Sequence, residues 1–366
     1  MNFDAKSLRQ CIYCHNFCKF CCAPYLATKN QKVIQTQKNY LIYLVNENKI
    51  EPNAELGKAV YLCNDCKRCE TYCIFEGKNV LPNNRYAKNL IFKNMLAPKK
   101  VYDIYNHLLN FGNFLGKKTR QSAVKDFDKN KRYDFLVYPG DYVNLLAPNI
   151  TKSFIKILKK LNKSFILCDD IKVSDGAIAL DLGMEELAEE LMERNFRKVT
   201  QYKFDALIVL NPYSYYCFKN DYGKYGFKFD FEIIHYIDFM ERHIDNLKIK
   251  KTNDYVKYFD PCVLSRWIKI NESPRNILRV LCNNQDFDLI KNREESECCG
   301  GNLSLIFPEI SRIITEGLLN EIKSYYEKTE VLITACPLCL SNLLKAQNSS
   351  RFKIYDLIEY ISNNMV

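Results

Sequence analysis

Most of the 17 cysteines in this chain fall in groups whose spacing suits metal ligands. Two groups near the N-terminus have four members each, Cys11, Cys14, Cys18 and Cys22, then Cys63, Cys66, Cys69 and Cys73. Three thiolates on one short turn can reach three corners of an iron–sulfur cube, and the fourth ligand then comes from further along the chain. Because this pattern occurs twice, we predict two [4Fe-4S] clusters in this region.

The fourth ligands are expected to be exchanged between the two motifs. In two-cluster ferredoxins the last cysteine of one motif ligates the other cluster. This rule gives one ligand set of Cys11, Cys14, Cys18 and Cys73, and another of Cys63, Cys66, Cys69 and Cys22. Cys21 is a rival for the last place. We prefer Cys22 because it keeps the three-residue gap found before Cys73 and lies nearer Pro24.

Zinc is the main alternative for these eight cysteines. It favours two Cys-x-x-Cys pairs that share one tetrahedron. The two motifs instead have triplets with a distant fourth cysteine, and the first has three residues between its second and third members. Triplets of this kind fit a cube better than a tetrahedron, so we favour iron and sulfide.

Five more cysteines recur near the C-terminus with gaps of more than thirty residues. They are Cys262, Cys298, Cys299, Cys336 and Cys339. Each lies where a strand is expected to end or the chain to turn, and the carboxyl ends of parallel strands meet at one edge of a sheet. Gly300 and Gly301 would let the backbone approach a cofactor closely. Five sulfurs that converge there exceed what one zinc ion needs.

The elements that must position these residues change character along the chain. Residues 1–116 read as short helices and loops, and 117–132 as a charged linker. After it, apolar strands alternate with amphipathic helices, the pattern of α/β layers with a parallel sheet. The strand–helix pattern repeats with an offset of 121 residues, so we expect two copies of one α/β unit, 133–248 and 249–366. The predicted fold class is α+β overall.

The cysteine pattern and the repeat together resemble the CCG-domain iron–sulfur proteins. This family includes the heterodisulfide reductase catalytic subunit and the iron–sulfur subunits of glycolate oxidase, anaerobic glycerol-3-phosphate dehydrogenase and lactate-utilisation complexes. The resemblance implies a ferredoxin-like domain followed by two CCG repeats. It also implies that the five C-terminal cysteines are catalytic ligands of a cluster, in one branch a non-cubane cluster where disulfide cleavage occurs.

The first repeat departs from the family pattern. Asp141 stands where the lone cysteine belongs, and Asn211 and Ser214 replace the Cys-x-x-Cys pair. We equate the segment 168–170, Cys-Asp-Asp, with Cys-Cys-Gly. One sulfur cannot hold a cluster, so this repeat is expected to be metal-free. A degenerate metal site that uses Asp141, Cys168 and Asp169 is the alternative.

Composition limits the setting in which the chain works. The net charge is +10, but lysines are spread along the chain and mixed with acids, so we expect no nucleic-acid partner. The first ten residues lack the features of a signal peptide, which favours a cytoplasmic location. No apolar run is long enough to span a bilayer, so any membrane contact would be peripheral and made through a partner.

These observations predict an oxidoreductase subunit. There is no Gly-x-Gly-x-x-Gly after a strand and no P-loop, so flavin or nicotinamide would belong to a partner, for which a flavoprotein dehydrogenase or another redox subunit is expected. The acceptor would be a disulfide or a quinone-type compound. The alternatives are a pure electron relay within a glycolate, lactate or glycerol-3-phosphate dehydrogenase complex, or a scaffold that metal stabilises.

Overall fold

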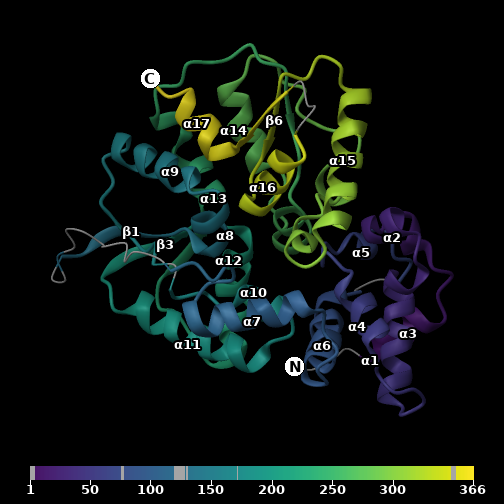
Figure 1. The fold of residues 1–366 in the computed structure, drawn as a ribbon. Coiled ribbons are helices and arrows are strands. Elements are labelled where there is room, and N and C mark those ends of the chain that lie inside the picture. The colour runs from purple at the N-terminus through teal and green to yellow at the C-terminus, as the bar shows by residue number, and fades with distance from the viewer. Residues whose placement is uncertain (1–4, 76–77, 119–127, 129–130, 171, 348–351) are drawn as a thin grey trace.

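The structure is a computed structural model that describes residues 5–75, 78–118, 128, 131–170, 172–347 and 352–366. Its described residues form a largely helical fold with two small parallel sheets (Figure 1), which confirms the predicted α+β class. Most of the predicted linker, 117–132, lies outside the described residues. The predicted domain boundaries stay predictions.

Short helices and turns carry the N-terminal cysteines. These elements are α1 (Ala5–Ile12), η1 (Phe17–Phe20), α2 (Ala23–Thr28), η2 (Gln31–Val33), α3 (Gln35–Asn46), α4 (Ala54–Tyr61), α5 (Arg68–Thr71), α6 (Val80–Lys93) and α7 (Lys99–Phe111). Three non-glycine residues between the cysteines, Asn16, Asp65 and Lys67, have positive φ angles. This backbone conformation is costly for residues with a side chain, and surrounding structure has to maintain it. Here Asn16 and Lys67 take this conformation at the N-caps of η1 and α5.

The first sheet follows with four parallel strands in the order β2-β1-β3-β4. Its strands are β1 (Tyr133–Tyr138), β2 (Phe165–Leu167), β3 (Phe204–Val209) and β4 (Glu232–His235). Its helices are α8 (Gly140–Leu146), α9 (Asn149–Lys160), α10 (Ala177–Asp181), α11 (Glu185–Thr200), α12 (Pro212–Tyr216) and α13 (Tyr236–His243), with π-helical η3 (Cys217–Asp221) and the 3-10 turns η4 (Tyr222–Tyr225) and η5 (Ile244–Asn246). The alternation of strands and helices that the sequence predicts after residue 132 is therefore present.

The second sheet has the same arrangement in a smaller form, with the strand order β5-β6-β7. Its strands are β5 (Val256–Tyr258), β6 (Val331–Thr334) and β7 (Lys353–Asp356). Its helices are π-helical η6 (Val263–Ile268), α14 (Ser273–Leu281), η7 (Arg293–Glu295), η8 (Gly301–Leu305), α15 (Pro308–Tyr325), α16 (Pro337–Lys345) and α17 (Leu357–Asn363). A parallel bridge between Tyr258 and Asp288 stands where the first sheet has β2.

Contacts between the two sheet units are reciprocal. Helix α9 contacts α17, and α13 contacts α14. In the same way α8 contacts α16, and α12 contacts η6. By order in the repeat, α9 corresponds to α14 and α13 to α17, while α8 corresponds to η6 and α12 to α16. Each pair of contacts therefore joins the same two positions of the repeat, once in each direction, as an approximate two-fold axis requires. This is the packing expected of two copies of one unit.

The N-terminal helices pack against the second sheet unit through α15, which contacts α2 (Figure 1). Helix α5 contacts η7, and α6 contacts α10 of the first sheet unit. The cysteine loops are thus held between both sheet units. Within the described residues, no helix is long and apolar enough to cross a membrane.

Candidate iron–sulfur sites

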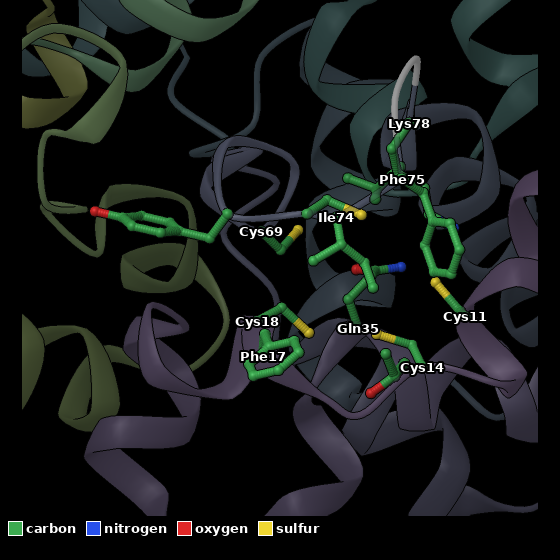
Figure 2. Close-up of a pocket in the computed structure, with 13 residues that line it drawn as sticks. Cys11, Cys14, Phe17, Cys18, Gln35, Cys69, Ile74, Phe75 and Lys78 are labelled. Carbon is green, nitrogen blue, oxygen red and sulfur yellow. The ribbon is translucent and has the colours of Figure 1, made fainter.

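The first predicted ligand set lines a single pocket between α1, α3 and the loop after α5. All four of its cysteines lie there, Cys11, Cys14, Cys18 and Cys73, and Cys69 is also part of the wall. Figure 2 shows the sulfur atoms of Cys11, Cys14 and Cys18 around the same space. With its open mouth, this space amounts to about 380 Å³. The structure therefore brings the distant Cys73 to the first motif, as the exchange rule predicts.

The second predicted ligand set lines a neighbouring pocket of about 400 Å³. Its cysteines are Cys22, Cys63, Cys66 and Cys69, and the rival Cys21 is in the wall as well. Cys69 lines both pockets, so the two candidate sites are adjacent. Ligation itself stays a prediction for both sets.

A chain of buried amides joins the two pockets. The Gln35 amide nitrogen donates to Asn39 Oδ1 at 2.9 Å and to Asn84 Oδ1 at 2.7 Å. Asn39 Nδ2 in turn donates to Cys11 Sγ at 3.1 Å, and Asn84 Nδ2 donates to Cys63 Sγ at 3.5 Å. Each candidate site thus has an amide donor on one sulfur, and both donors are oriented by the same glutamine. Such hydrogen bonds to ligand sulfurs are a means of tuning a cluster.

A buried ammonium group lies beside the second pocket. Lys38 is 4% exposed and its side chain hydrogen-bonds to Cys63. Burial opposes its charge, yet the neighbouring sulfurs of Cys63 and Cys22 raise the pKa of Lys38. Burying a cation away from water is costly unless negative charge accompanies it. A thiolate-ligated cluster would supply that charge, so the surroundings of Lys38 fit the predicted cofactor.

The five C-terminal cysteines converge at the carboxyl ends of β5 and β6. Cys262 precedes η6, Cys336 caps α16, and Cys339 lies in the first turn of that helix. Cys298 and Cys299 precede Gly300, whose φ of +75° turns the chain into η8. Cys299 Sγ lies 3.0 Å from Cys339 Sγ, and all five cysteines are buried, with exposures of 7% or less. The predicted set is therefore brought together in one water-poor site.

The second N-terminal pocket and this C-terminal site meet at one sulfur contact. Cys66 forms a side-chain hydrogen bond with Cys298, and that bond lowers the pKa of the Cys66 thiol to about 6. Three further bonds hold the two loops together. Trp267 Nε1 donates to Asp65 O at 2.9 Å, Asn302 Nδ2 donates to Asn64 O at 2.8 Å, and Leu303 N donates to Asn64 Oδ1 at 3.2 Å. The three candidate sites therefore form one continuous row.

The first repeat has a polar counterpart of the C-terminal site, but the segment predicted to replace Cys-Cys-Gly is wrong. Gly176, with φ +81°, precedes α10 as Gly300 precedes η8, which makes 174–176, Ser-Asp-Gly, the equivalent segment. Ser214 Oγ donates to Asp175 Oδ2, in the place of the Cys299–Cys339 contact. The sequence match failed because it followed the sulfur of Cys168 rather than the glycine that the turn requires.

Cys168 does not belong to this polar counterpart. Its thiol is buried near Lys198, and burial raises its pKa to about 12. Asp141 does belong to it, since the side chain of Ser174 hydrogen-bonds to that carboxyl group, and burial raises the pKa of Asp141. The alternative metal site of Asp141, Cys168 and Asp169 is therefore not assembled as proposed. Among the described residues, no three or more His, Cys, Asp and Glu side chains are grouped tightly enough to hold a single metal ion. The sulfurs around an iron–sulfur cluster lie further apart than the ligands of one ion.

Polar residues around the sulfurs were missed in the sequence. The segment 35–39, Gln-Thr-Gln-Lys-Asn, has no apolar residue, yet four of its five side chains are buried. That polar run at the start of a helix was a usable signal. Arg266 follows Cys262 by four residues and is also buried, but no pattern in the sequence marks it.

Comparisons with known proteins agree with the cysteine pattern. Residues 256–344 match the CCG cysteine-rich domain family. The probable iron-sulfur-binding oxidoreductase FadF of Bacillus subtilis is 23% identical, over 84% of this chain and 46% of its own length. The EtfAB:quinone oxidoreductase of Syntrophomonas wolfei is 24% identical, over 83% of this chain and 46% of its own. A component of the dihydromethanophenazine:CoB–CoM heterodisulfide reductase of Methanosarcina acetivorans is 24% identical, over 83% of this chain and 77% of its own.

These similarities confirm the predicted CCG resemblance, and the relatives carry the names of oxidoreductases and redox-complex subunits. The chain spans about half the length of the first two relatives. Among solved structures, an aspartate racemase of Picrophilus torridus covers 63% of this chain and 91% of its own, at 12% identity and a TM-score of 0.32. That value is too low to support an argument.

Proposed function

We propose that this chain is an iron–sulfur electron-transfer subunit with three centres. Its residues 256–344 match the CCG cysteine-rich domain family, and the chain is similar to an iron–sulfur-binding oxidoreductase. The cysteines of the two N-terminal pockets would each hold a [4Fe-4S] cluster, and the five C-terminal cysteines a third cluster. When bound, such clusters supply one-electron transfer over a wide range of potentials. The hydrogen bonds from Trp267 to Asp65 and from Asn302 to Asn64 carry this proposal, because they join the second N-terminal site to the C-terminal site.

The two ends of the row of sites differ in solvent exposure. The rim of the first pocket includes Phe17 and Ile74, which are 47% and 61% exposed. The C-terminal cysteines are buried. We infer that a redox partner, for which a flavoprotein dehydrogenase is the expected class, approaches the first pocket. The chain's own part is to hold the thiolates, to exclude water and to place charge beside the sulfurs.

The C-terminal site supports either of two roles. A disulfide or quinone-type acceptor would react there, as in a heterodisulfide reductase, or the site would only pass electrons to another protein of the complex. The naming of relatives as part of a heterodisulfide reductase and as a quinone oxidoreductase is compatible with both. The complete set of five buried cysteines supports the first role, because a catalytic centre needs an intact site.

A single assay separates these roles. Anaerobically purified protein with full iron content is supplied with reduced viologen and offered either a heterodisulfide or a quinone analogue. Turnover with one acceptor identifies the catalytic role and its acceptor class. Clusters that are reduced and reoxidised without turnover of either compound would assign a relay. Iron-loaded protein that shows no redox response at all would contradict the proposed function.

A further inference from the structure

Arg266 bridges the second N-terminal pocket and the C-terminal site. It lies four residues after Cys262, within the π-helical segment η6, and is 3% exposed. Its Nε donates to the carbonyl oxygen of Cys66, on the N-terminal side. Its Nη1 donates to Ser296 O at 2.9 Å and to Glu294 O at 3.0 Å, on the loop that leads to Cys298. The guanidinium group is therefore fixed between the two sites.

The third guanidinium nitrogen of Arg266, Nη2, is the one that the described residues leave without a hydrogen bond. Arg266 Nη2 is buried and has no hydrogen-bond partner among the described residues. A buried donor without a partner is costly, more so on a charged group, so such donors usually face a ligand or water. The sulfurs of Cys66, Cys262 and Cys298 lie near this guanidinium group, as does the cation of Arg68. A carboxylate does not take that place, unlike at Arg275, which pairs with Asp260 and Asp288.

We propose that Arg266 is a positioning residue whose free Nη2 donates a hydrogen bond to the C-terminal cluster, stabilises its reduced form and thereby draws electrons across the Cys66–Cys298 contact. This inference rests on the proposed function. The physical reason is that reduction adds negative charge, and both positive charge and N–H donors near the sulfurs favour the more negative state. Removal of the guanidinium should therefore lower the midpoint potential of the C-terminal centre.

The test is a redox titration of the anaerobic full-length protein, monitored by electron paramagnetic resonance. Arg266→Gln should lower the midpoint potential of the C-terminal centre by about 59 mV or more, which is a tenfold change in the ratio of reduced to oxidised centre. Arg266→Lys, which keeps the charge, should recover part of the shift. Arg312→Gln is the matched control, because it removes one positive charge from the exposed surface of α15. Its potentials should equal those of the wild type.

The contrary outcomes are distinct. Arg266→Gln protein with full iron content and unchanged potentials would overturn this inference and leave the proposed function intact. Wild-type protein that binds no iron would overturn the proposed function instead. If Arg266→Gln fails to assemble clusters, wild-type protein labelled with guanidino-¹⁵N arginine decides the matter. Pulsed resonance should then detect ¹⁵N coupling at the reduced C-terminal centre, and the absence of this coupling would refute the hydrogen bond.

Discussion

Cys21 and Cys22 are neighbours in the chain but have different surroundings. Cys21 Sγ donates to Cys18 O at 3.2 Å and to Arg68 O at 3.7 Å, contacts that a protonated thiol makes and a thiolate does not. Cys22 has the Lys38 ammonium group and Cys63 close to it. A metal-bound cysteine must be a thiolate, so these partners favour Cys22 as the ligand.

This difference gives a paired prediction at the residue scale. Cys22→Ser should lose about four iron atoms per chain, because one cube loses its fourth sulfur. Cys21→Ser should keep the wild-type iron content, since serine also donates to the two carbonyl groups. Iron and acid-labile sulfide analysis of both proteins checks this. If the two results were exchanged, Cys21 would be the ligand.

A second prediction concerns the C-terminal ligands. Cys336→Ser should abolish the resonance signal of the C-terminal centre and leave those of the two cubes. Cys282→Ser serves as the control, because Cys282 is equally buried and lies next to Tyr360 rather than the other sulfurs. Loss of the cube signals in Cys336→Ser with native-like folding would show that the third centre is not independent of the others.

At the scale of elements, helix α3 supplies the polar side chains that face both pockets. Asn39→Leu removes the donor to Cys11 Sγ, so the midpoint potential of the first cube should fall by tens of millivolts while its iron is retained. Gln37→Leu, on the same helix and outside both pocket walls, is the control. Equal potentials for the Asn39→Leu protein and the wild type would show that this amide contributes nothing to tuning.

Helix α17 begins with a buried acid that should make stability depend on pH. Burial raises the pKa of Asp356, the N-cap residue, to about 8. The pKa of an aspartate in the unfolded chain is about 3.9, so folding favours the protonated form of Asp356. The stabilising contribution is complete below about pH 4 and is lost as the pH rises to about 8, with an upper bound of about 6 kcal/mol. Asp356→Asn keeps the cap and should remove this dependence. The same pH dependence of the unfolding free energy in the wild type and in the Asp356→Asn protein would contradict this prediction.

At the scale of the whole molecule, one repeat is expected to hold a cluster and the other to hold a hydrogen-bonded substitute. Asn211 Nδ2 donates to Ser214 Oγ at 3.0 Å, and Asn211 caps α12. Asn211→Ala should therefore cost about 1–2 kcal/mol of stability, as lost caps do, with no change in iron content. Chemical denaturation measures the loss of stability, and iron analysis measures the iron content. A loss of iron that exceeds the loss of folded protein would mean that the first repeat also binds metal.

Sequence alone predicted the parts of the architecture that repeat. The offset of 121 residues was visible because His235 and Asp356 both end a strand and cap the helix that follows. The grouping of the cysteines was predictable because cysteines are rare and their spacing suits a cofactor. Cys73 and Cys22 were placed correctly beside the opposite motif in space.

The remaining features depend on tertiary contacts that no short pattern encodes. Arg266 is held by hydrogen bonds to Cys66 and Ser296, which lie 200 and 30 residues away in the chain. The segment 174–176 has no sulfur, so its equivalence to 298–300 shows in the positive φ of the two glycines and in the Ser214–Asp175 hydrogen bond. Lys38 reads as a surface residue until the fold buries it beside Cys63. Local sequence thus indicated which ligands converge, and the structure shows what surrounds them.

The central claim is that thiolate-bound iron and sulfide occupy three sites in this chain. The most direct test is iron and acid-labile sulfide analysis of anaerobically purified protein, together with its absorption spectrum before and after dithionite. We expect about eight iron atoms from the two cubes plus those of the C-terminal site, and a brown colour that dithionite bleaches and reoxidation restores. Colourless protein that contains zinc and no sulfide would contradict it.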